Sequence, residues 1–564
     1  MNIAQGLPAG WIMILGAFLV PLLRGPLRQA YMLLLPILGF AQLFALPLGT
    51  DLVYEFMGYD LELMRVDVLS RVFGAVFYIA ALLSVIYAMK VESALEGASA
   101  LIYAGSAIAA VFAGDLITLF VCWELTAISS VFLIWASGTE AALRSGFRYL
   151  VIQVGSGVLL LAGTIIHYAE TGSLAFDHLG LVSVGTGLIF LAFGIKAAFP
   201  FLHTWLQDAY PNATVTGTVF LSAFTTKLAI YALARGFAGT EILIPIGAAM
   251  TAFPIFFAVI ENDLRKVLAY SLNNQLGFMV VGIGIGTELA LNGTVAHVFA
   301  HVIYKALLFM TMGAVLYRVG TIKGSELGGL YKSMPLTACF CIVGAASISA
   351  FPLTSGFVTK SMILTAAADG HYTIAFLVLL FASAGVFHHS GIKIPFFAFF
   401  AHDRGHRVKE APLNMLVAMA AAATLCLAIG IFPQVLYGLL PYPVDYLPYT
   451  TSHVVSMLQL LLFSALAFTF LMKTGLYPPE LRSIVLDSDW VYRRFLPRIR
   501  DGLGAGYTMV VSSSVTRFQA GRRALLAQIA RVHQPFGPFG EPWPTGATTL
   551  WAAIMLLTYL VLDY

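Results

Sequence analysis

The chain has 564 residues, of which 59% are hydrophobic and only 10% are charged. A soluble globular domain carries roughly 25% charged residues, so this composition excludes an ordinary soluble enzyme and predicts a polytopic membrane protein. The formal net charge of +3 gives no indication of nucleic-acid binding, because lysine and arginine in the loops of a membrane protein report its topology.

Apolar stretches long enough to cross a bilayer recur along the whole chain. A spanning helix needs about 20 apolar residues, and by that length we expect about sixteen spans. Residues 334–368 are too long for one straight span, and Met1 to Gly10 lacks the basic segment of a cleavable signal peptide. The expected spans are 9–23, 29–49, 68–89, 97–113, 115–137, 146–167, 181–206, 216–237, 241–260, 264–287, 289–317, 334–368, 372–399, 412–440, 453–473 and 547–562.

Lysine and arginine are concentrated in alternate loops. If the N-terminus lies outside, the inside loops hold most of the basic residues, and residues 474–546 form an arginine-rich inside segment. The outside loops then hold little more than Arg65 and Arg235, and they carry acidic residues instead. The positive-inside rule therefore predicts that both termini lie outside.

Cysteine usage gives no sign of a disulfide framework or a metal site. The four cysteines all lie in apolar stretches, at Cys122, Cys339, Cys341 and Cys426. Cys339 and Cys341 are two residues apart, so on a helix they point in different directions. We expect no metal and no cofactor in this chain.

Eight ionisable residues are expected inside the spans. A charge at the centre of a lone helix costs about 2.5–3.5 kcal/mol, so each must face protein or water. Any one of them could be a structural ion pair or a lysine that reaches toward a helix end. Structural pairing favours equal numbers of acids and bases, whereas one acid accompanies five lysines here. The eight are Glu124, Lys196, Lys227, His297, His301, Lys305, Lys360 and Lys393.

A row of buried lysines has a specific chemical use. Burial disfavours the charged form of a lysine, while a nearby carboxylate favours it, so such a group can exchange a proton near neutral pH; histidine does the same. We interpret the set as a proton relay in which Glu124 modulates a lysine, Lys196. His297, His301 and Lys305 lie on one helical face, and a stacked relay fits them better than a metal pair.

The lysines also indicate an internal duplication. Lys196 is followed by Pro200 in "GIKAAFP", and Lys360 is preceded by Pro352 in "AFPLTSGFVTK". Broken helices are tolerated at membrane depth only beside a cavity or protein. The two lysines lie in the seventh and twelfth spans, and an odd separation gives two units of opposite orientation, as in many transporters. The span after each carries a second lysine, Lys227 or Lys393.

Five motifs together resemble the antiporter-like family shared by Mrp-type multisubunit sodium/proton antiporters and the proton-pumping membrane subunits of respiratory complex I. They cover roughly residues 68–400 in the family's order. The "GIKIPFFAFF" segment looks most like the D-type subunit of Mrp antiporters and its relatives. The motifs are "WELTAISS", "GIKAAFPFLHTWLQDAY", "DLRKVLAYSLNNQLGFM", "HVFAHVIYKALLFMTMGA" and "FPLTSGFVTK".

The resemblance implies an all-α polytopic fold with about 14 core transmembrane helices, two inverted five-helix repeats and broken helices 7 and 12. Glu124 resembles the family's carboxylate on the fifth helix, and Lys196 and Lys360 its lysines on the broken helices. Lys227 resembles the lysine of the eighth helix, and His297 and His301 the central histidines. The expected parts are 1–96 (helices 1–3), 97–237 (first repeat), 241–399 (second repeat), 400–473 (helices 14–15), 474–546 (amphipathic extension) and 547–564 (a final transmembrane helix).

Two features depart from the family pattern. "LAYSLNNQLG" has Asn273 and Asn274 where small or hydroxyl residues are more usual. The chain also continues past the fourteenth span, and this extension is similar to the lateral element of the largest antiporter-like subunit of complex I. It is shorter, and we expect the glycines of "DGLGAGY" to interrupt it.

Three functions are compatible with these residues. The first is the proton-translocating subunit of a multisubunit monovalent cation/proton antiporter, moving Na⁺ in exchange for protons with other membrane subunits in a bacterial cytoplasmic membrane. The second is a pumping subunit of a complex I-like dehydrogenase or a membrane-bound hydrogenase, in which redox chemistry belongs to partner subunits. The third is the membrane subunit of an inorganic-carbon uptake system with a soluble partner. Neighbouring genes would discriminate among them, and the coupling cation stays open.

Overall fold

The computed structural model describes residues 6–477, 480–481, 485, 487–534, 537–538, 540 and 543–563. The chain divides into two compact units, Met1–Val485 and Leu486–Tyr564.

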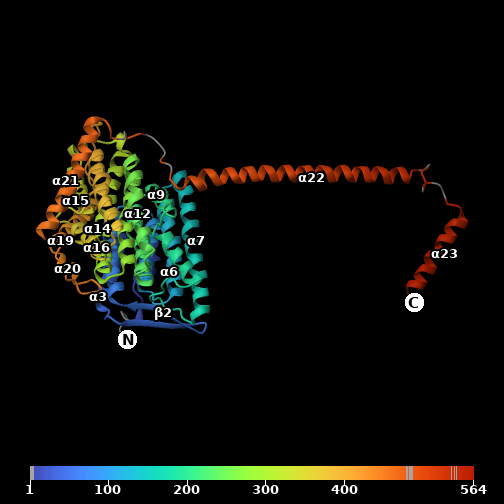
Figure 1. Ribbon diagram of the computed structural model, residues 1–564, viewed down its shortest axis with the longest axis horizontal. Helices are drawn as coiled ribbons and strands as arrows, with labels where there is room; N and C mark the ends of the chain where they lie inside the picture. The colour runs from blue at the N-terminus through green and yellow to red at the C-terminus, as the bar shows by residue number, and fades with distance from the viewer. Residues whose placement is uncertain are drawn as a thin grey trace. The chain divides into compact units, whose positions relative to one another are not determined.

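The first unit is a helical bundle whose elements pack side by side around α14 (Figure 1). α14 is buried along its most apolar stretch. Short 3₁₀ turns lie at Val20–Leu22, Tyr210–Asn212, Gly324–Glu326 and Leu330–Lys332, and π-helical turns at Phe387–Ile392 and Phe396–Phe400 flank α18. Its α-helices are α2 (Trp11–Ala17), α3 (Gly25–Ala45), α4 (Val68–Ala88), α5 (Ala94–Phe112), α6 (Leu116–Trp135), α7 (Glu140–Thr171), α8 (Val184–Lys196), α9 (Thr204–Ala209), α10 (Gly217–Ala223), α11 (Thr225–Gly236), α12 (Leu243–Ile260), α13 (Leu264–Ile285), α14 (Glu288–Val319), α15 (Pro335–Ile348), α16 (Ser355–Asp369), α17 (Thr373–Val386), α18 (Lys393–Pro395), α19 (Leu413–Ile431), α20 (Pro433–Tyr437) and α21 (Thr451–Thr474).

Twelve helices in the described residues are long and apolar enough to cross a membrane, fewer than the sequence analysis expects. The other four expected stretches are also helical. Those at 9–23, 181–206 and 334–368 contain apolar helices of only 10–17 residues. The fourth forms α13, where the three consecutive amides from Asn273 make the helix more polar. The chain is a multi-pass membrane protein, and 334–368 is broken as expected, into α15 and α16.

A β-hairpin lies in one loop, where the sequence analysis expected no strands. β1 (Thr50–Phe56) pairs antiparallel with β2 (Tyr59–Val66). Met57 and Gly58 form the turn with φ of 52° and 82°, and two positive φ values match the twist of a two-residue hairpin. The methionine at the first turn position hides the usual Asn-Gly or Asp-Gly signal.

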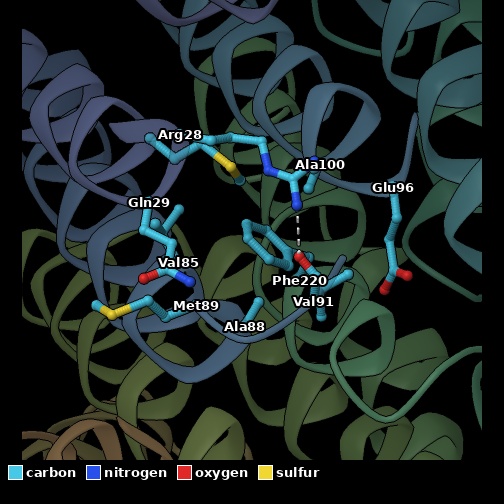
Figure 2. A pocket seen from close by; sticks show the side chains of 11 residues that line it. Arg28, Gln29, Val85, Ala88, Met89, Val91, Glu96, Ala100 and Phe220 are labelled. Carbon is cyan, nitrogen blue, oxygen red and sulfur yellow. Dashed lines mark hydrogen bonds between the residues drawn. The ribbon is translucent and has the colours of Figure 1, made fainter. Parts of the chain in front are cut away.

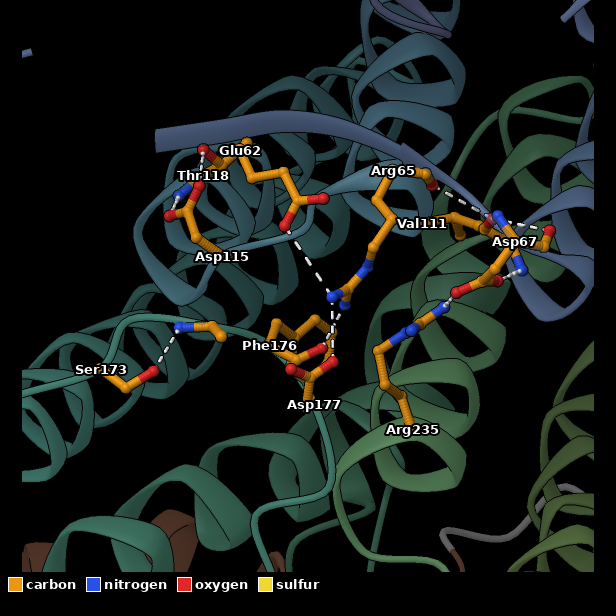
Figure 3. Close-up of polar contacts among 12 residues, drawn as sticks. Glu62, Arg65, Asp67, Val111, Asp115, Thr118, Ser173, Phe176, Asp177 and Arg235 are labelled. Atoms are coloured by element: carbon orange, nitrogen blue, oxygen red, sulfur yellow. Dashed lines mark hydrogen bonds and ion pairs between the residues drawn. The ribbon is translucent and has the colours of Figure 1, made fainter. Parts of the chain in front are cut away.

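Ion pairs join β2 to the loop after α7, and Asp67, which follows β2, to helix α11 (Figure 3). Arg65 of β2 donates to Asp177 Oδ1 at 2.9 Å, in the loop after α7. Arg235 of α11 pairs with Asp67 at 2.5 Å. The charge pattern assigned these loops to one side of the membrane, and they do meet on one face of the bundle.

The surroundings shift the pKa values of two carboxyls on this face in opposite directions. Burial raises the pKa of Glu62, although Arg65 opposes it. Burial also acts to raise the pKa of Asp67, but the charge of Arg235 and the hydrogen bonds from Ser70 hold that pKa below its usual range. Asp67 is therefore both the N-cap of α4 and an anchor for α11.

The loop between α9 and α10 is held in place by two buried charged residues. Glu96 accepts hydrogen bonds from the hydroxyls of Thr214 and Thr216 at 2.7 and 2.6 Å. Arg265, at the start of α13, donates to the carbonyl of Ala213 at 3.1 Å. Arg265 therefore ties the start of α13 to the loop between α9 and α10, which is a structural role.

Glu96 also borders a small crevice between α3, α4 and α5 (Figure 2). Arg28 crosses it and donates to the Val91 carbonyl at 3.4 Å, and Phe220 of α10 closes its floor. None of the eight buried ionisable residues lines this crevice.

The second unit contains α22 (Leu496–Val532) and α23 (Thr545–Leu562), with a π-helical turn at Val491–Phe495 before α22. The sequence analysis expected glycines to interrupt this region, but α22 continues through Gly502 and Gly504. Large apolar side chains recur along α22 mostly every three or four residues, with one gap of seven after Phe518, and they are exposed, at Leu496, Ile499, Leu503, Tyr507, Val511, Val515, Phe518, Leu525, Leu526 and Ile529. This spacing makes one apolar stripe along a basic helix.

Candidate functional site

Lys196 lies in the interior of the bundle, at the first broken helix. Lys196 is the last residue of α8, and α9 begins only at Thr204. In between, Ala198 and Phe201 have φ of 63° and 68°. Such values cost a non-glycine residue free energy, and they persist where the surrounding structure enforces them, often at functional sites.

The ammonium of Lys196 is bound by α6. Its Nζ donates to the Trp123 carbonyl at 2.7 Å and to Thr126 Oγ1 at 3.0 Å. It also lies 4.2 Å from the centroid of the Trp123 ring, which is a cation–π contact. Lys196 is fully buried, so these groups replace its hydration.

Glu124 follows Trp123 on α6. Its Oε1 is buried and has no hydrogen-bond partner among the described residues. The carboxylate packs on Gly157 of α7, where an added Cβ would overlap Oε1. Glu124 and Lys196 interact electrostatically, without a direct ion pair in the described structure. The modulating role of Glu124 stays a prediction, and its position beside the lysine site allows it.

The second broken helix repeats the backbone of the first. α15 ends at Ile348 and α16 begins at Ser355, and Ala350 and Leu353 between them have φ of 57° and 69°. Lys360 lies on α16 after the break. Its Nζ donates to the Ile348 carbonyl at 3.2 Å and lies 4.8 Å from the Phe278 ring centroid.

Lys227 lies at another helix interruption. α10 ends at Ala223 and α11 begins at Thr225, and the Lys227 ammonium donates to the Ser222 carbonyl at 2.5 Å. α11 packs against α14, where the charges of Lys227 and Lys305 act on His301. The first and second halves therefore meet at α14.

The histidines of α14 line one face of this central helix. The rings of His297 and His301 lie 6.2 Å apart with an interplanar angle of 23°. His297 contacts Thr359 Oγ1 at 3.1 Å and Gln275 Oε1 at 3.2 Å through its two ring nitrogens. Neither ring nitrogen of His301 has a hydrogen-bond partner in the described residues.

Lys305 begins a continuous set of hydrogen bonds. Its Nζ donates to Ser271 Oγ at 2.9 Å, Ser390 Oγ donates to Ser271 Oγ at 2.7 Å, and Ser390 Oγ contacts His389 Nδ1 at 2.9 Å. His389 is fully buried and was not among the predicted site residues. The signal was available, because "FHHSGIK" places two histidines inside an apolar span and just before Lys393.

Lys393 lies at the far end of this second half. Its Nζ donates to the carbonyls of Ala258, Val259 and Glu261 at 3.2, 2.6 and 2.7 Å. These are the last carbonyls of α12, which a lysine can cap. Nζ also forms an ion pair with Glu480 at 2.9 Å, a residue that the sequence analysis did not single out.

The structure thus brings seven of the eight predicted residues to full burial in one bundle, and it places Glu124 partly buried beside Lys196. It does not join them into one unbroken hydrogen-bonded line. Buried polar atoms with no partner among the described residues remain on Gln153, Thr226 and Asn273 as well as on Glu124 and His301. Buried polar groups of this kind are where water can bridge.

Comparison with known proteins identifies the class. Residues 113–388 match the family model described as "NADH:quinone oxidoreductase/Mrp antiporter, TM". These residues contain α6 to α17 and both broken helices. Over that region, which is just under half of the chain, the sequence is similar to this antiporter-like family.

Curated relatives span several kinds of complex. The D subunit of the Na(+)/H(+) antiporter of Alkalihalophilus pseudofirmus is 32% identical over 319 residues, which are 53% of this chain and 64% of that protein. Hydrogenase-4 component B of Escherichia coli is 28% identical over 419 residues, which are 65% of this chain and 62% of that protein. The chain thus matches less than two thirds of the length of each.

Solved structures show the same fold at low sequence identity. A chain of the Mrp complex from Dietzia sp. DQ12-45-1b superposes with a TM-score of 0.70 at 22% identity, covering 81% of this chain and 100% of that one. A chain of respiratory complex I from Thermus thermophilus gives 0.67 at 22% identity, covering 77% and 99%. The fold of this chain is therefore that of an antiporter-like membrane subunit.

Proposed function

We propose that this chain is the proton-translocating membrane subunit of a multisubunit monovalent cation/proton antiporter, similar to the D-type subunit of Mrp antiporters. The observation that carries the proposal is the set of buried basic side chains that runs through both broken helices and the central helix α14. Protons move among Lys196, Lys227, the α14 histidines and Lys360, and Glu124 sets the charge state of Lys196.

The hydrogen bonds connect some steps of the proposed relay directly, whereas other steps need bridging water. Proton transfer needs groups within hydrogen-bond reach or one water apart. Lys305, Ser271, Ser390 and His389 meet that condition directly. The steps between Lys196 and Lys227, and between Lys227 and His301, need bridging water, for which the unpartnered polar atoms offer sites.

The remaining parts of the proposal follow from the relatives and the charge pattern. Helices α5 to α11 and α12 to α18 form the two inverted repeats, and both termini lie outside a bacterial cytoplasmic membrane. The partners are other membrane subunits, and the exchanged cation is Na⁺. The match to the D subunit of a Na(+)/H(+) antiporter supports both statements.

A redox-driven proton pump is the second candidate. Two relatives favour it, Hydrogenase-4 component B and the L subunit of the F(420)H(2) dehydrogenase of Methanosarcina mazei, each 28% identical. The exposed apolar stripe of α22 also fits a protein that reaches along its neighbours in a complex.

Everted membrane vesicles that contain the whole complex distinguish the two. On the antiporter assignment, adding Na⁺ or K⁺ to respiring vesicles collapses the pH gradient, and the cation dependence disappears when Lys360 is replaced by alanine. On the pump assignment, a reduced electron donor builds the gradient and cations have no effect. Proton movement that depends on neither cations nor a donor would contradict both.

The extension offers a separate test of partnership. We expect residues 474–546 to act as a clamp along a neighbouring subunit, because α23 gives the extension a second anchor. A chain truncated at Thr474 should insert but lose partner subunits when the complex is solubilised mildly and sized. If every partner remains bound, α22 is instead an interfacial helix on anionic lipid.

A further inference from the structure

Glu480 is the only described carboxylate that forms an ion pair with a lysine of the relay. Its Oε1 lies 2.9 Å from Lys393 Nζ. The Lys393 side chain has no exposure, whereas the Glu480 side chain retains 7%, although both of its carboxylate oxygens are buried. Glu480 is thus the less buried member of the pair.

Tyr477, three residues before Glu480, is anchored to the bundle by ring contacts. Just after α21, Tyr477 packs on His388, with ring centroids 5.6 Å apart and an interplanar angle of 23°. It also packs edge-on against Phe468 of α21, with centroids 5.2 Å apart. The chain thus folds back over the helix end that carries Lys393, and Glu480 reaches Lys393 as part of the packed bundle.

We propose that Glu480 is the proton-exchange residue that connects Lys393 with the aqueous face. The inference rests on the proposed relay and adds its terminal step. The ammonium of Lys393 gives one proton to the Glu480 carboxylate, which leaves a neutral amine and a neutral carboxylic acid. The acid then releases that proton through a bridging water to the bulk and returns to the carboxylate. In the reverse direction, Glu480 takes a proton from water and passes it to the amine.

Other titratable groups lie near Lys393, but none of those described combines contact with its Nζ and a carboxylate that can accept its proton. His388 and His389 precede it on the same segment, and their rings do not hydrogen-bond to its Nζ. Glu261 contributes its backbone carbonyl, while its carboxylate is engaged by the N–H groups of Asn262 and Asp263 and by Lys266. Glu261 therefore finishes α12, and Glu480 is left as the proton acceptor.

The electrostatic environment of Glu480 suits the step. Burial raises the pKa of Glu480, while the charge of Lys393 opposes that rise. The proton affinity of the Glu480 carboxylate is thereby brought closer to that of the Lys393 amine. A smaller difference in proton affinity makes transfer between the two groups less uphill.

The test uses the assembled complex in proteoliposomes with a pH-sensitive dye. Glu480→Gln should lower proton flux by at least about tenfold without loss of subunits, and Glu480→Asp should retain most of the flux. The matched control is Asp403→Asn. Asp403 also forms ion pairs on the bundle surface, with Lys332 and Arg407, and its loss should leave flux unchanged.

Chemical rescue separates proton exchange from a structural ion pair. Formate supplies a small carboxylate, so it should raise the flux of Glu480→Ala several-fold and saturably, with no effect on Asp403→Asn. Wild-type flux in Glu480→Gln, or a Glu480→Ala complex that formate cannot rescue, would overturn the inference. Lys360→Ala tests the relay itself. If it transports normally, the proposed function fails whatever Glu480 does, and if it is inactive while Glu480→Gln is normal, only the role of Glu480 fails.

Discussion

The two broken helices of the bundle share a backbone but differ in chemistry. Each contains alanine, phenylalanine and proline followed by a second residue with positive φ. Superposing these positions relates Ala198 to Ala350, a separation of 152 residues. Lys196 and Lys360 are 164 residues apart, so they are not equivalent positions, although the sequence analysis paired them.

Each lysine reaches its break from a different side. Lys196 precedes the first break, and Ile348 occupies the corresponding place in the second. Lys360 follows the second break, yet its ammonium reaches back to the carbonyl of Ile348. The two breaks therefore share the backbone distortion and the presence of an ammonium beside it, but not the position of the lysine. Only the first site has a carboxylate neighbour among the described residues, Glu124.

The largest effect is expected from removing either ammonium. Lys196→Ala and Lys360→Ala should each abolish proton flux, because a relay that runs through both halves stops at either gap. Lys→Arg at either position should also fail, since guanidinium stays charged at physiological pH. Dye quenching in everted vesicles measures the flux. A robust pH gradient in either arginine variant would show that the site needs only a positive charge.

Glu124→Gln tests the difference between the two sites. We expect a loss of flux on the order of a hundredfold with an intact complex, because Lys196 loses the one carboxylate near it. Subunit content measured after mild solubilisation controls for assembly. Wild-type rates in a fully assembled Glu124→Gln complex would mean that the first site works without a carboxylate, as the second does.

Gly157→Ala displaces the same carboxylate without removing its charge. The added methyl would overlap Glu124 Oε1, so the side chain must move. With an effective dielectric constant near 20, moving the carboxylate about 1–2 Å away from the ammonium costs roughly 1 kcal/mol, or about fivefold in rate.

The matched control for this variant lies on the same helix. A Cβ at Gly155 meets no atom within 4 Å, so Gly155→Ala should leave transport unchanged. Equal rates for the two alanine variants would show that the exact place of the Glu124 carboxylate does not matter.

Much of the fold could be predicted from hydrophobic stretches, and the failures have physical causes. Every expected span is helical, including α13, but polar side chains and helix breaks make four of them look unlike ordinary spans. The hairpin was missed because its turn is Met57–Gly58. The glycines of α22 were read as an interruption, although a helix tolerates glycine at a modest cost.

The site was predictable as a set of residues and not as a network. Charged side chains in apolar spans are conspicuous, so the eight residues could be selected from the sequence alone. Their partners could not, because Ser271, Ser390 and Gln275 are uncharged and Glu480 lies outside the spans. Packing of distant segments decides such contacts, and composition does not report it.

The smallest expected effect concerns the backbone that the two breaks share. Ala198 and Ala350 hold positive φ values that glycine adopts without strain. Ala198→Gly and Ala350→Gly should therefore preserve the thermal stability of the complex or raise it slightly, since relief of about 1 kcal/mol offsets the entropy cost of glycine. Ala197 is the matched control. It is equally buried and has φ of −74°, so Ala197→Gly should lower stability by roughly 0.5–1 kcal/mol. A fluorescence melt of the assembled complex compares the three variants. If Ala198→Gly and Ala350→Gly shift the melting temperature in opposite directions, the two breaks carry different strain, and their common backbone does not come from one repeated design.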